Sequence, residues 1–233
     1  MKEENLVTTT IGEIVAADFR AATVFKEAGI DFCCGGKMTL GEACEEKGIE
    51  LSALVEKLEN PEDKQGTVVH NFNEWQPGFL CDYIVNVHHT YVKKTLPELV
   101  FYTQKIARVH GENHPELREV ADLFAQVNSD LLQHLKKEEE KIFPAVKDVF
   151  GNGAERSRSV IREEIKALLG EHEFAGGAID RINVITDGYK LPEDACNSYR
   201  ITLEMLENFE DDLHTHVHLE NNILFPKTLE KIN

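Results

Sequence analysis

A histidine and glutamate pattern that occurs twice in the second half of the chain is the strongest constraint on its fold. Segments that begin at His134 and His216 share the spacing His-x3-Glu-x4-Phe-Pro, 82 residues apart. A further pair, His89 and His172, lies upstream of them with an offset of 83. A repeat identifies equivalent positions before any element is assigned. This region is therefore expected to contain two copies of a helix pair. Each copy supplies one histidine from its first helix and a His-x3-Glu from its second.

Apolar residues recur with helical periodicity throughout this part of the chain, and Gly, Pro and Asn separate the periodic segments. No strand pattern is present in the sequence. Short connections between long helices favour antiparallel neighbours, so we expect an all-α, up-down-up-down four-helix bundle. The predicted helices cover residues 78–110, 115–150, 154–187 and 193–231.

The repeated His-x3-Glu spacing places two potential ligands on one helix face, a turn apart. Each histidine also continues an apolar stripe: Val127 and Leu131 lead into His134 at steps of four and three, and Leu213 precedes His216 by three. In a bundle these stripes converge on the core. Six side chains are therefore expected to meet at one level: His89, His134, Glu138, His172, His216 and Glu220.

Two carboxylates buried among apolar side chains would be very costly without a cation. A mixed set of imidazole and carboxylate ligands suits iron, and facing ligands within a bundle follow the plan of di-iron carboxylate proteins. We therefore predict two iron ions, bridged by the carboxylates and an oxygen, with about one open position each. Manganese or a mixed metal pair also fits these ligand types.

A structural interpretation competes with the metal site, because a single histidine on an apolar face is usually an ordinary core residue. Six such residues in a twofold repeat favour the metal site. His88 would replace His89 if the helix register slipped by one residue, but the repeat spacing favours His89. Gly176 lies one turn after His172 and leaves room for a small ligand. The remaining histidines are interpreted as structural or surface residues: His70, His110, His114, His214 and His218.

Charge and composition exclude several classes of function. The 233 residues include 25 basic and 42 acidic side chains, a net charge of −17, which disfavours nucleic acid or an anionic membrane surface as a partner. No run of about 18 apolar residues occurs, so a spanning helix is not expected. The first residues lack the basic and apolar regions of a secretory signal. Five cysteines, an odd number, suit the reducing cytoplasm, which is the expected location.

The beginning of the chain has a different chemistry from the rest. Residues 1–60 contain three of the cysteines and no histidine, and we expect a small helical domain there. Its helices are predicted from two Thr-x-x-Glu capping boxes, at Thr10 and Thr39, and from left-handed stops at Gly29 and Gly48. Breakers and polar residues then indicate a linker over 61–76, followed by the bundle domain over 77–233.

The adjacent Cys33 and Cys34 lie on a glycine-rich turn between those helices. A disulfide between neighbouring residues requires a strained ring, so a structural bridge is not expected. Two free thiolates could instead transfer iron or exchange disulfides, and nearby Lys37 would favour the thiolate form. Two inert, partly buried thiols are the alternative. The other three cysteines are expected to pack in the interior: Cys44, Cys81 and Cys196.

Both halves together resemble a known family. The bundle with its six ligands resembles the hemerythrin-like domain, and the Gly29 to Gly36 turn followed by Thr39 and Leu40 is similar to the small domain of the iron-sulfur cluster repair di-iron proteins. Two features depart from oxygen-carrying hemerythrins, which have another histidine at the position of Gly176 and a His-x4-Asp in the last helix. The resemblance implies a cytoplasmic di-iron protein that helps to restore clusters damaged by nitric oxide or oxidants.

Alternative functions remain open at this point. The main hypothesis is a non-enzymatic repair protein that supplies iron to damaged iron-sulfur proteins. The same centre could act as a nitric oxide reductase, or as a sensor or carrier that binds NO or O2 reversibly. A metal-free interaction bundle would tolerate alanine at all six ligand positions. Neither the client proteins nor homodimer formation through the small domain is decided by the sequence.

Overall fold

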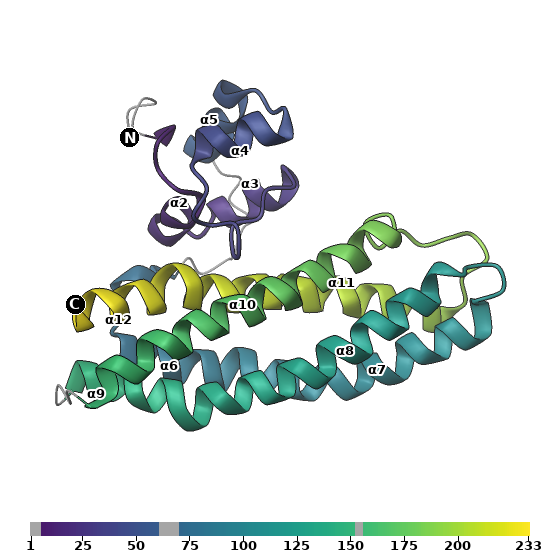
Figure 1. Cartoon of the computed structure of the whole chain (residues 1–233). Coiled ribbons are helices and arrows are strands. Elements are labelled where there is room, and N and C mark those ends of the chain that lie inside the picture. The colour runs from purple at the N-terminus through teal and green to yellow at the C-terminus, as the bar shows by residue number, and fades with distance from the viewer. Residues whose placement is uncertain (1–5, 61–69, 152–155) are drawn as a thin grey trace. The chain divides into compact units, whose positions relative to one another are not determined.

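A computed structural model describes residues 6–60, 70–151 and 156–233 of the chain (Figure 1). Helices account for the regular structure in these residues, and no strand is assigned there apart from a single isolated bridge between Thr10 and Thr39. This confirms the predicted all-α class. Among the described helices, none has both the length and the apolar character needed to cross a bilayer.

The small N-terminal region consists of short helices, as predicted. Both capping boxes are present: the Thr10 and Thr39 side chains accept hydrogen bonds from the backbone N–H groups of Glu13 and Glu42, and each glutamate bonds back to its threonine. Gly48 has a φ of 65° and ends its helix in the left-handed conformation. The helices are α2 (Ile11–Ala17), α3 (Ala21–Glu27), α4 (Leu40–Lys47), α5 (Leu51–Glu59) and the short η1 (Phe72–Glu74).

The remaining helices form four long continuous stretches that agree closely with the predicted ranges. Three of the four are interrupted by a π-helical turn. The first stretch is α6 (Pro77–Ile84), η2 (Val85–His89) and α7 (Thr90–His110); the second is α8 (Glu116–Lys137), η3 (Glu138–Ile142) and α9 (Phe143–Gly151); the third is α10 (Arg156–Ile185); the fourth is α11 (Asn197–His218), η4 (Leu219–Leu224) and α12 (Phe225–Ile232).

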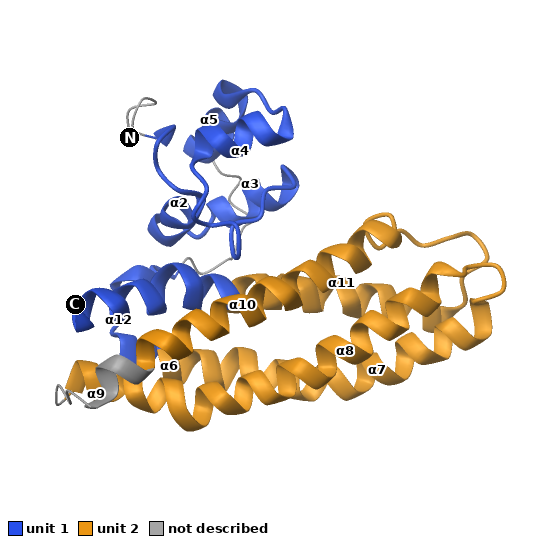
Figure 2. Ribbon diagram, viewed as in Figure 1, with its two compact units in different colours: residues 1–80, 217–233 blue, residues 81–216 orange. Residues whose placement is uncertain are grey.

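Two compact units are distinguished in Figure 2, one of residues 1–80 and 217–233 and the other of residues 81–216. The boundary near residue 216 falls inside a continuous helix, because α11 runs through His218 and passes directly into η4. A single cut in the chain therefore does not separate the two units. The predicted linker lies partly outside the described residues, which resume at residue 70.

Two of the π turns follow from the Phe-Pro dipeptide of the repeat. Pro144 and Pro226 each stand at the second position of the α segment that follows a π turn. Proline has no backbone N–H to donate to the carbonyl four residues earlier and its ring crowds that carbonyl, so the preceding turn widens. The repeat therefore fixes a backbone irregularity next to Glu138 and Glu220, in addition to the side chains themselves.

The second unit has an apolar core between its helices. Helix α8 packs against both α7 and α10. Phe124 on α8 and Phe209 on α11 are both fully buried and meet edge to face, with ring centroids 5.3 Å apart. This packing gives the polar residues that follow along the same stripes a rigid and dry setting.

Candidate metal centre

Glu138 is at the centre of the buried polar cluster in the second unit. It begins η3 and has no exposed surface. Its Oε1 lies 3.2 Å from Nε2 of His134 and 4.0 Å from Nε2 of His172, and its Oε2 lies 3.4 Å from Nε2 of His89. The two oxygens of one carboxylate thus face imidazoles from different helices.

The histidines around this carboxylate are themselves close together and almost completely buried. Nε2 of His172 lies 3.0 Å from Nε2 of His134. On the other side, the rings of His89 and His216 meet edge to face, with centroids 4.9 Å apart. These imidazoles come from four separate helices: η2, α8, α10 and α11. The converging stripes predicted from the sequence are therefore present.

Glu220, the sixth predicted ligand, follows His216 by four residues on the continuous helix that passes from α11 into η4. It is also fully buried. A separation of four residues keeps the two side chains on one helix face, as for His134 and Glu138. Gly176, where space for a small ligand is expected, is buried one turn after His172 in α10.

The donor set of this cluster fits a metal ion. Atoms of His89, Glu138 and His216 lie within 4.8 Å of one another, and so do those of His134, Glu138 and His172. Imidazole nitrogens together with carboxylate oxygens suit iron, manganese or zinc, and not calcium or magnesium. A carboxylate at zero exposure also needs a compensating positive charge.

In two of the histidines, His134 and His89, Nε2 faces Glu138 and Nδ1 is paired with a carboxylate at the edge of the core. Nδ1 of His134 lies 2.8 Å from Glu171 Oε2, and Lys137 also donates to Glu171. The hydrogen bonds from His134 and Lys137 lower the pKa of Glu171 to about 2, because their effect is larger than the rise that partial burial causes. An ionised partner fixes the imidazole tautomer that leaves Nε2 free to bind a metal.

His89 has an equivalent arrangement built from other elements. Its Nδ1 lies 2.7 Å from Glu139 Oε1, and Lys93 donates to both oxygens of the same carboxylate. Partial burial opposes ionisation of Glu139, but the bonds from Lys93 and His89 outweigh it, so its pKa is lowered. Both histidines of the first helix pair thus end a lysine-carboxylate-histidine chain, and the carboxylate comes from the first pair for His89 and from α10 for His134.

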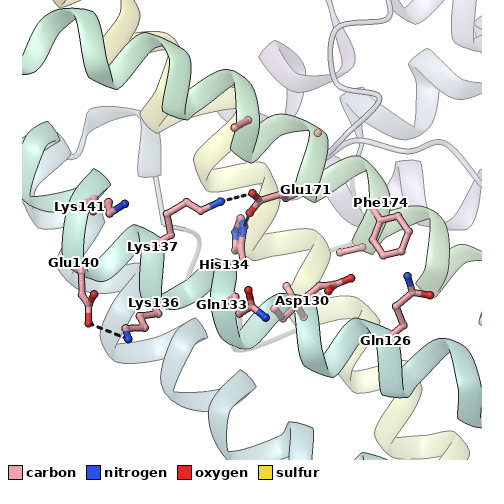
Figure 3. Close-up of a pocket in the computed structure, with 14 residues that line it drawn as sticks. Gln126, Asp130, Gln133, His134, Lys136, Lys137, Glu140, Lys141, Glu171 and Phe174 are labelled. Atoms are coloured by element: carbon pink, nitrogen blue, oxygen red, sulfur yellow. Dashed lines mark hydrogen bonds and ion pairs between the residues drawn. The ribbon is translucent and has the colours of Figure 1, made fainter.

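A pocket of about 770 Å³ opens on the outer side of His134, between α8 and α10. Figure 3 shows His134 and Lys137 pointing toward Glu171 at this pocket, with Phe174 further along its rim. Several lysines also line it, including Lys136 and Lys141. The pocket therefore brings solvent close to one predicted ligand without exposing the cluster.

The adjacent histidine, His88, has a different environment from His89. It is buried at 4% exposure, and its Nδ1 lies 2.9 Å from Asp212 Oδ1. Its ring stacks on that of His216 at 5.7 Å between centroids. The side chain that faces Glu138 is His89, in agreement with the register favoured by the repeat spacing.

Sequence reasoning missed the two carboxylates behind the histidines. Glu139 lies in a run of charged residues that resembles a solvated surface, and Glu171 merely precedes a predicted ligand. Their partners are on other helices, so spacing along the chain contains no signal for them. Lys93 and Lys137 provide a local signal for these carboxylates. Each lysine lies one helical turn after a predicted histidine ligand and so places a cation beside that imidazole on the same helix face.

In the first unit, the Cys33-Cys34 turn is organised by Asp31. The Asp31 Oδ1 atom accepts hydrogen bonds from the backbone N–H groups of Cys33 and Cys34, at 2.8 and 3.0 Å, and Oδ2 accepts one from Gly35 at 2.7 Å. Both cysteines are free thiols, with sulfur atoms 3.9 Å apart. The absence of a bridge between them agrees with the prediction.

The proposed effect of Lys37 on these thiols does not hold for Cys33. Its neighbour Cys34, its burial and the Asp31 carboxylate all raise the pKa of the Cys33 thiol well above its usual range. Metal-free Cys33 is therefore protonated at neutral pH. Binding of a cation between the sulfurs and Asp31 would reverse this balance, because a coordinated thiol loses its proton.

Asn222 of η4 connects the cysteine turn to the last helix, within the same unit. Its Nδ2 donates to the backbone carbonyls of Phe32 and Cys33, at 3.1 and 3.0 Å. Gly12 and Gly36 leave the space for this amide, since a Cβ at either position would approach Asn222 within 2.6 Å. His218, interpreted from the sequence as a structural or surface residue, is fully buried, and its ring packs against Phe32 of the cysteine turn.

Two family descriptions match separate ranges of the chain. Residues 7–62 match the ScdA_N family, described as Domain of Unknown function (DUF542). Residues 82–228 match the family described as Hemerythrin HHE cation binding domain. The second match covers more than half of the chain and contains all six predicted metal ligands. The chain is therefore a hemerythrin-domain protein of the cation-binding class.

Curated relatives share both parts. The iron-sulfur cluster repair protein ScdA of Staphylococcus epidermidis is 33% identical over 218 residues, which cover 93% of this chain and 96% of that protein. The iron-sulfur cluster repair protein YtfE of Pectobacterium atrosepticum is 33% identical over 223 residues, which cover 94% and 96%. The chain belongs to the family that contains these ScdA and YtfE proteins.

Proposed function

We propose that this protein repairs iron-sulfur clusters damaged by nitrosative or oxidative stress, by supplying iron from a di-iron centre. Its relatives are named as iron-sulfur cluster repair proteins, and its larger domain belongs to a cation-binding family. The observation that carries the proposal is Glu138, a fully buried carboxylate whose two oxygens face histidines of different helices. That geometry is the one a carboxylate needs in order to bridge two metal ions.

In the proposed centre, His89 and His216 would hold one iron, and His134 and His172 would hold the other. Glu138 and Glu220 would supply the carboxylate ligands. When bound, the iron pair supplies exchangeable metal and open positions for a small ligand such as NO or O2. The protein residues hold the imidazole tautomers through Glu139 and Glu171 and exclude bulk water from the core.

Two features support release of iron from this centre to a client. The pocket beside His134 brings solvent close to one proposed ligand, which is itself buried. The charged chain of Lys137 and Glu171 lies at that opening, where rearrangement of a surface ion pair would change the support of His134. A labile iron requires this kind of partial access, whereas a purely structural metal is usually closed on all sides.

Cys33 and Cys34 are proposed to accept or transfer the iron. Two sulfurs and the Asp31 carboxylate lie close enough to share one cation. Their turn is attached by Asn222 to η4, the segment that contains Glu220. The clients in this proposal are damaged iron-sulfur proteins of the cytoplasm.

The direct test is recovery of a cluster enzyme after damage with nitric oxide. Anaerobically iron-loaded protein is added, and the returning activity of the damaged enzyme is measured. His134→Ala and the double variant Cys33→Ser/Cys34→Ser are run in parallel. His70→Ala, which changes an exposed histidine outside the cluster, is the matched control.

Recovery with the wild type and the control, and its loss in the other two variants, would support repair through iron and thiols together. Loss in His134→Ala alone would retain the iron centre and remove the proposed role of the cysteines. No recovery with fully loaded protein would contradict the repair function. Formation of nitrous oxide in that case would indicate nitric oxide reduction at the same centre.

A further inference from the structure

Cys196 and His110 form a hydrogen-bonded pair at the end of the second unit where α7 joins α8 (Figure 1). His110 is the last residue of α7, and Cys196 immediately precedes α11. The Cys196 Sγ atom lies 3.1 Å from Nε2 of His110. The His110 ring also packs against Tyr199, with ring centroids 5.3 Å apart. Since Cys196 is exposed, a nucleophile and a neighbouring base are both available to reagents in solvent.

Cys196 also caps the N-terminus of α11. Its carbonyl accepts a hydrogen bond from the backbone N–H of Arg200, as the residue that precedes a helix does. Its sulfur accepts hydrogen bonds from the backbone N–H groups of Ser198 and Tyr199. The N–H groups at the beginning of a long helix attract negative charge, and α11 has 22 residues. The helix and the imidazole therefore both favour the thiolate form of Cys196.

This environment distinguishes Cys196 from Cys33 and Cys44. The bond from His110 and those from the helix N–H groups lower the pKa of the Cys196 thiol to about 7. The neighbouring Cys34 and burial raise the pKa of Cys33, and burial raises that of Cys44. Exchange with a disulfide is fastest for a thiol whose pKa lies near the ambient pH, because the thiol is then ionised and still strongly nucleophilic. Of these three thiols, Cys196 is the one suited to exchange at neutral pH.

The other thiol of the second unit is too far away to displace a group bound at Cys196. This is Cys81, which is fully buried and lies 29 residues before His110 on the continuous stretch from α6 to α7. At about 1.5 Å of rise per residue, that separation is roughly 40 Å. A mixed disulfide formed at Cys196 is therefore not resolved into an internal disulfide within this unit.

From this geometry we propose that Cys196 is a modification site, at which the thiol exchanges with a small disulfide to form a mixed disulfide, and that His110 is its base. Nε2 of His110 accepts the thiol proton, and the thiolate attacks one sulfur of the small disulfide. The bond between the two sulfurs of the reagent breaks as the new bond to Sγ forms. The second sulfur leaves with the electron pair and takes the proton from His110. Cys196 is oxidised and the leaving sulfur is reduced, so the small disulfide is itself the oxidant.

Reaction of the full chain with bis(2-hydroxyethyl) disulfide tests this proposal. The reagent is uncharged, so the net charge of −17 does not repel it. Peptide mass spectrometry follows each modified cysteine with time, and removal of the adduct by dithiothreitol identifies it as a disulfide. We expect the adduct at Cys196 to form several-fold faster than any at Cys44 or Cys81, which are buried. Its rate should reach half of the maximum near pH 7.

Three variants assign the reaction to this pair. Cys196→Ser should remove the fast-forming adduct and should stay folded, because serine also caps a helix N-terminus. His110→Ala should slow the reaction several-fold at pH 7 and move the half-maximal rate to higher pH, which a loss of packing alone would not do. His214→Ala, which changes another histidine of the second unit, is the control and should react like the wild type.

An unchanged melting temperature confirms that each variant is folded, and the pH profile of the wild type keeps the test valid if His110→Ala unfolds. The proposal would be overturned if no adduct formed at Cys196. A wild-type rate that is half-maximal at about pH 8.5, the ordinary value for cysteine, would also overturn it. So would equal rates at pH 7 in His110→Ala and the wild type. The exchange needs no metal, so none of these results depends on the proposed iron centre.

Discussion

At the scale of single residues, the chemistry of this protein depends on which polar groups are buried together. Glu138 would destabilise the core as an isolated charge, and the histidines that surround it make it a candidate metal ligand. The cysteines show the same dependence on surroundings. Cys44 and Cys81 are buried, as predicted, but the expectation was wrong for Cys196, which is exposed.

Cys196 is predicted to be the most reactive of these three thiols. Its sulfur lies 3.1 Å from Nε2 of His110, and this hydrogen bond lowers its pKa to about 7. The thiolate, which is the reactive form, therefore becomes abundant above pH 7. His110→Ala should raise that pKa and slow alkylation of Cys196 several-fold at pH 7.

The reaction rate is measured with iodoacetamide and peptide mass spectrometry. Near pH 10 the wild type and His110→Ala should react alike, because the thiol is ionised in both. A rate at pH 7 that does not change in His110→Ala would contradict the role of the histidine. A Cys44 that reacts as fast as Cys196 would contradict the burial of Cys44 in the folded protein.

At the scale of elements, the sequence predicted most of what lies along one helix and little of what lies between helices. The repeat, the capping boxes and the apolar stripes are local patterns, and from them the sequence predicted the helix ranges and the buried histidines around Glu138. Glu139 and Glu171 acquire their roles from histidines on other helices, which spacing does not encode. The π turns were also not predicted, although the Phe-Pro dipeptide after Glu138 and Glu220 provided a signal for two of them.

The contact between the cysteine turn and η4 can be tested with a double-mutant cycle. A Cβ at Gly36 would lie 2.5 Å from Asn222 Oδ1, and that amide is held by the carbonyls of Phe32 and Cys33. Gly36→Ala should therefore lower the free energy of unfolding by about 1–3 kcal/mol. In an Asn222→Ala background, Gly36→Ala should lower the free energy of unfolding by less, because the side-chain amide that obstructs the new Cβ is absent.

Chemical denaturation of the four proteins measures this coupling. Gly177→Ala is the matched control, since a Cβ there meets open space within helix α10. It should be neutral or stabilising by up to about 1 kcal/mol. Equal costs of Gly36→Ala in both backgrounds would show that Asn222 does not occupy the space beside the turn.

At the scale of the whole molecule, a dry apolar core and a buried polar cluster occur in the same bundle. A buried polar cluster destabilises the folded state when no metal compensates its charge, so packing in the apolar core must offset this cost. Phe124→Ala, which removes a fully buried ring packed on Phe209, should lower the free energy of unfolding by about 3–5 kcal/mol. Phe101 on α7 is 60% exposed, and Phe101→Ala should change it by less than about 0.5 kcal/mol.

Both values are obtained from urea unfolding of the iron-loaded protein. A loss below about 1 kcal/mol for Phe124→Ala would contradict the described core. A loss for Phe101→Ala as large as that for Phe124→Ala would indicate that this exposed ring is covered in solution, for example by a second copy of the chain.

Metal binding should also appear in global stability, because an ion that binds only the folded state stabilises it. The melting temperature of the wild type should rise on anaerobic addition of Fe²⁺ and fall again when a chelator removes the iron. Glu138→Gln keeps the shape of the side chain and removes its charge, so it should reduce this rise. An equal rise in Glu138→Gln and the wild type would place the stabilising iron elsewhere.

The most direct test of the central claim is the iron content of the purified, anaerobically loaded protein. The wild type should hold two iron ions per chain, and His134→Ala and His216→Ala should each hold markedly fewer. His114→Ala, a histidine outside the cluster, should retain the wild-type amount. A folded wild type without bound iron, or an iron content that survives both His134→Ala and His216→Ala, would contradict a di-iron centre in this bundle.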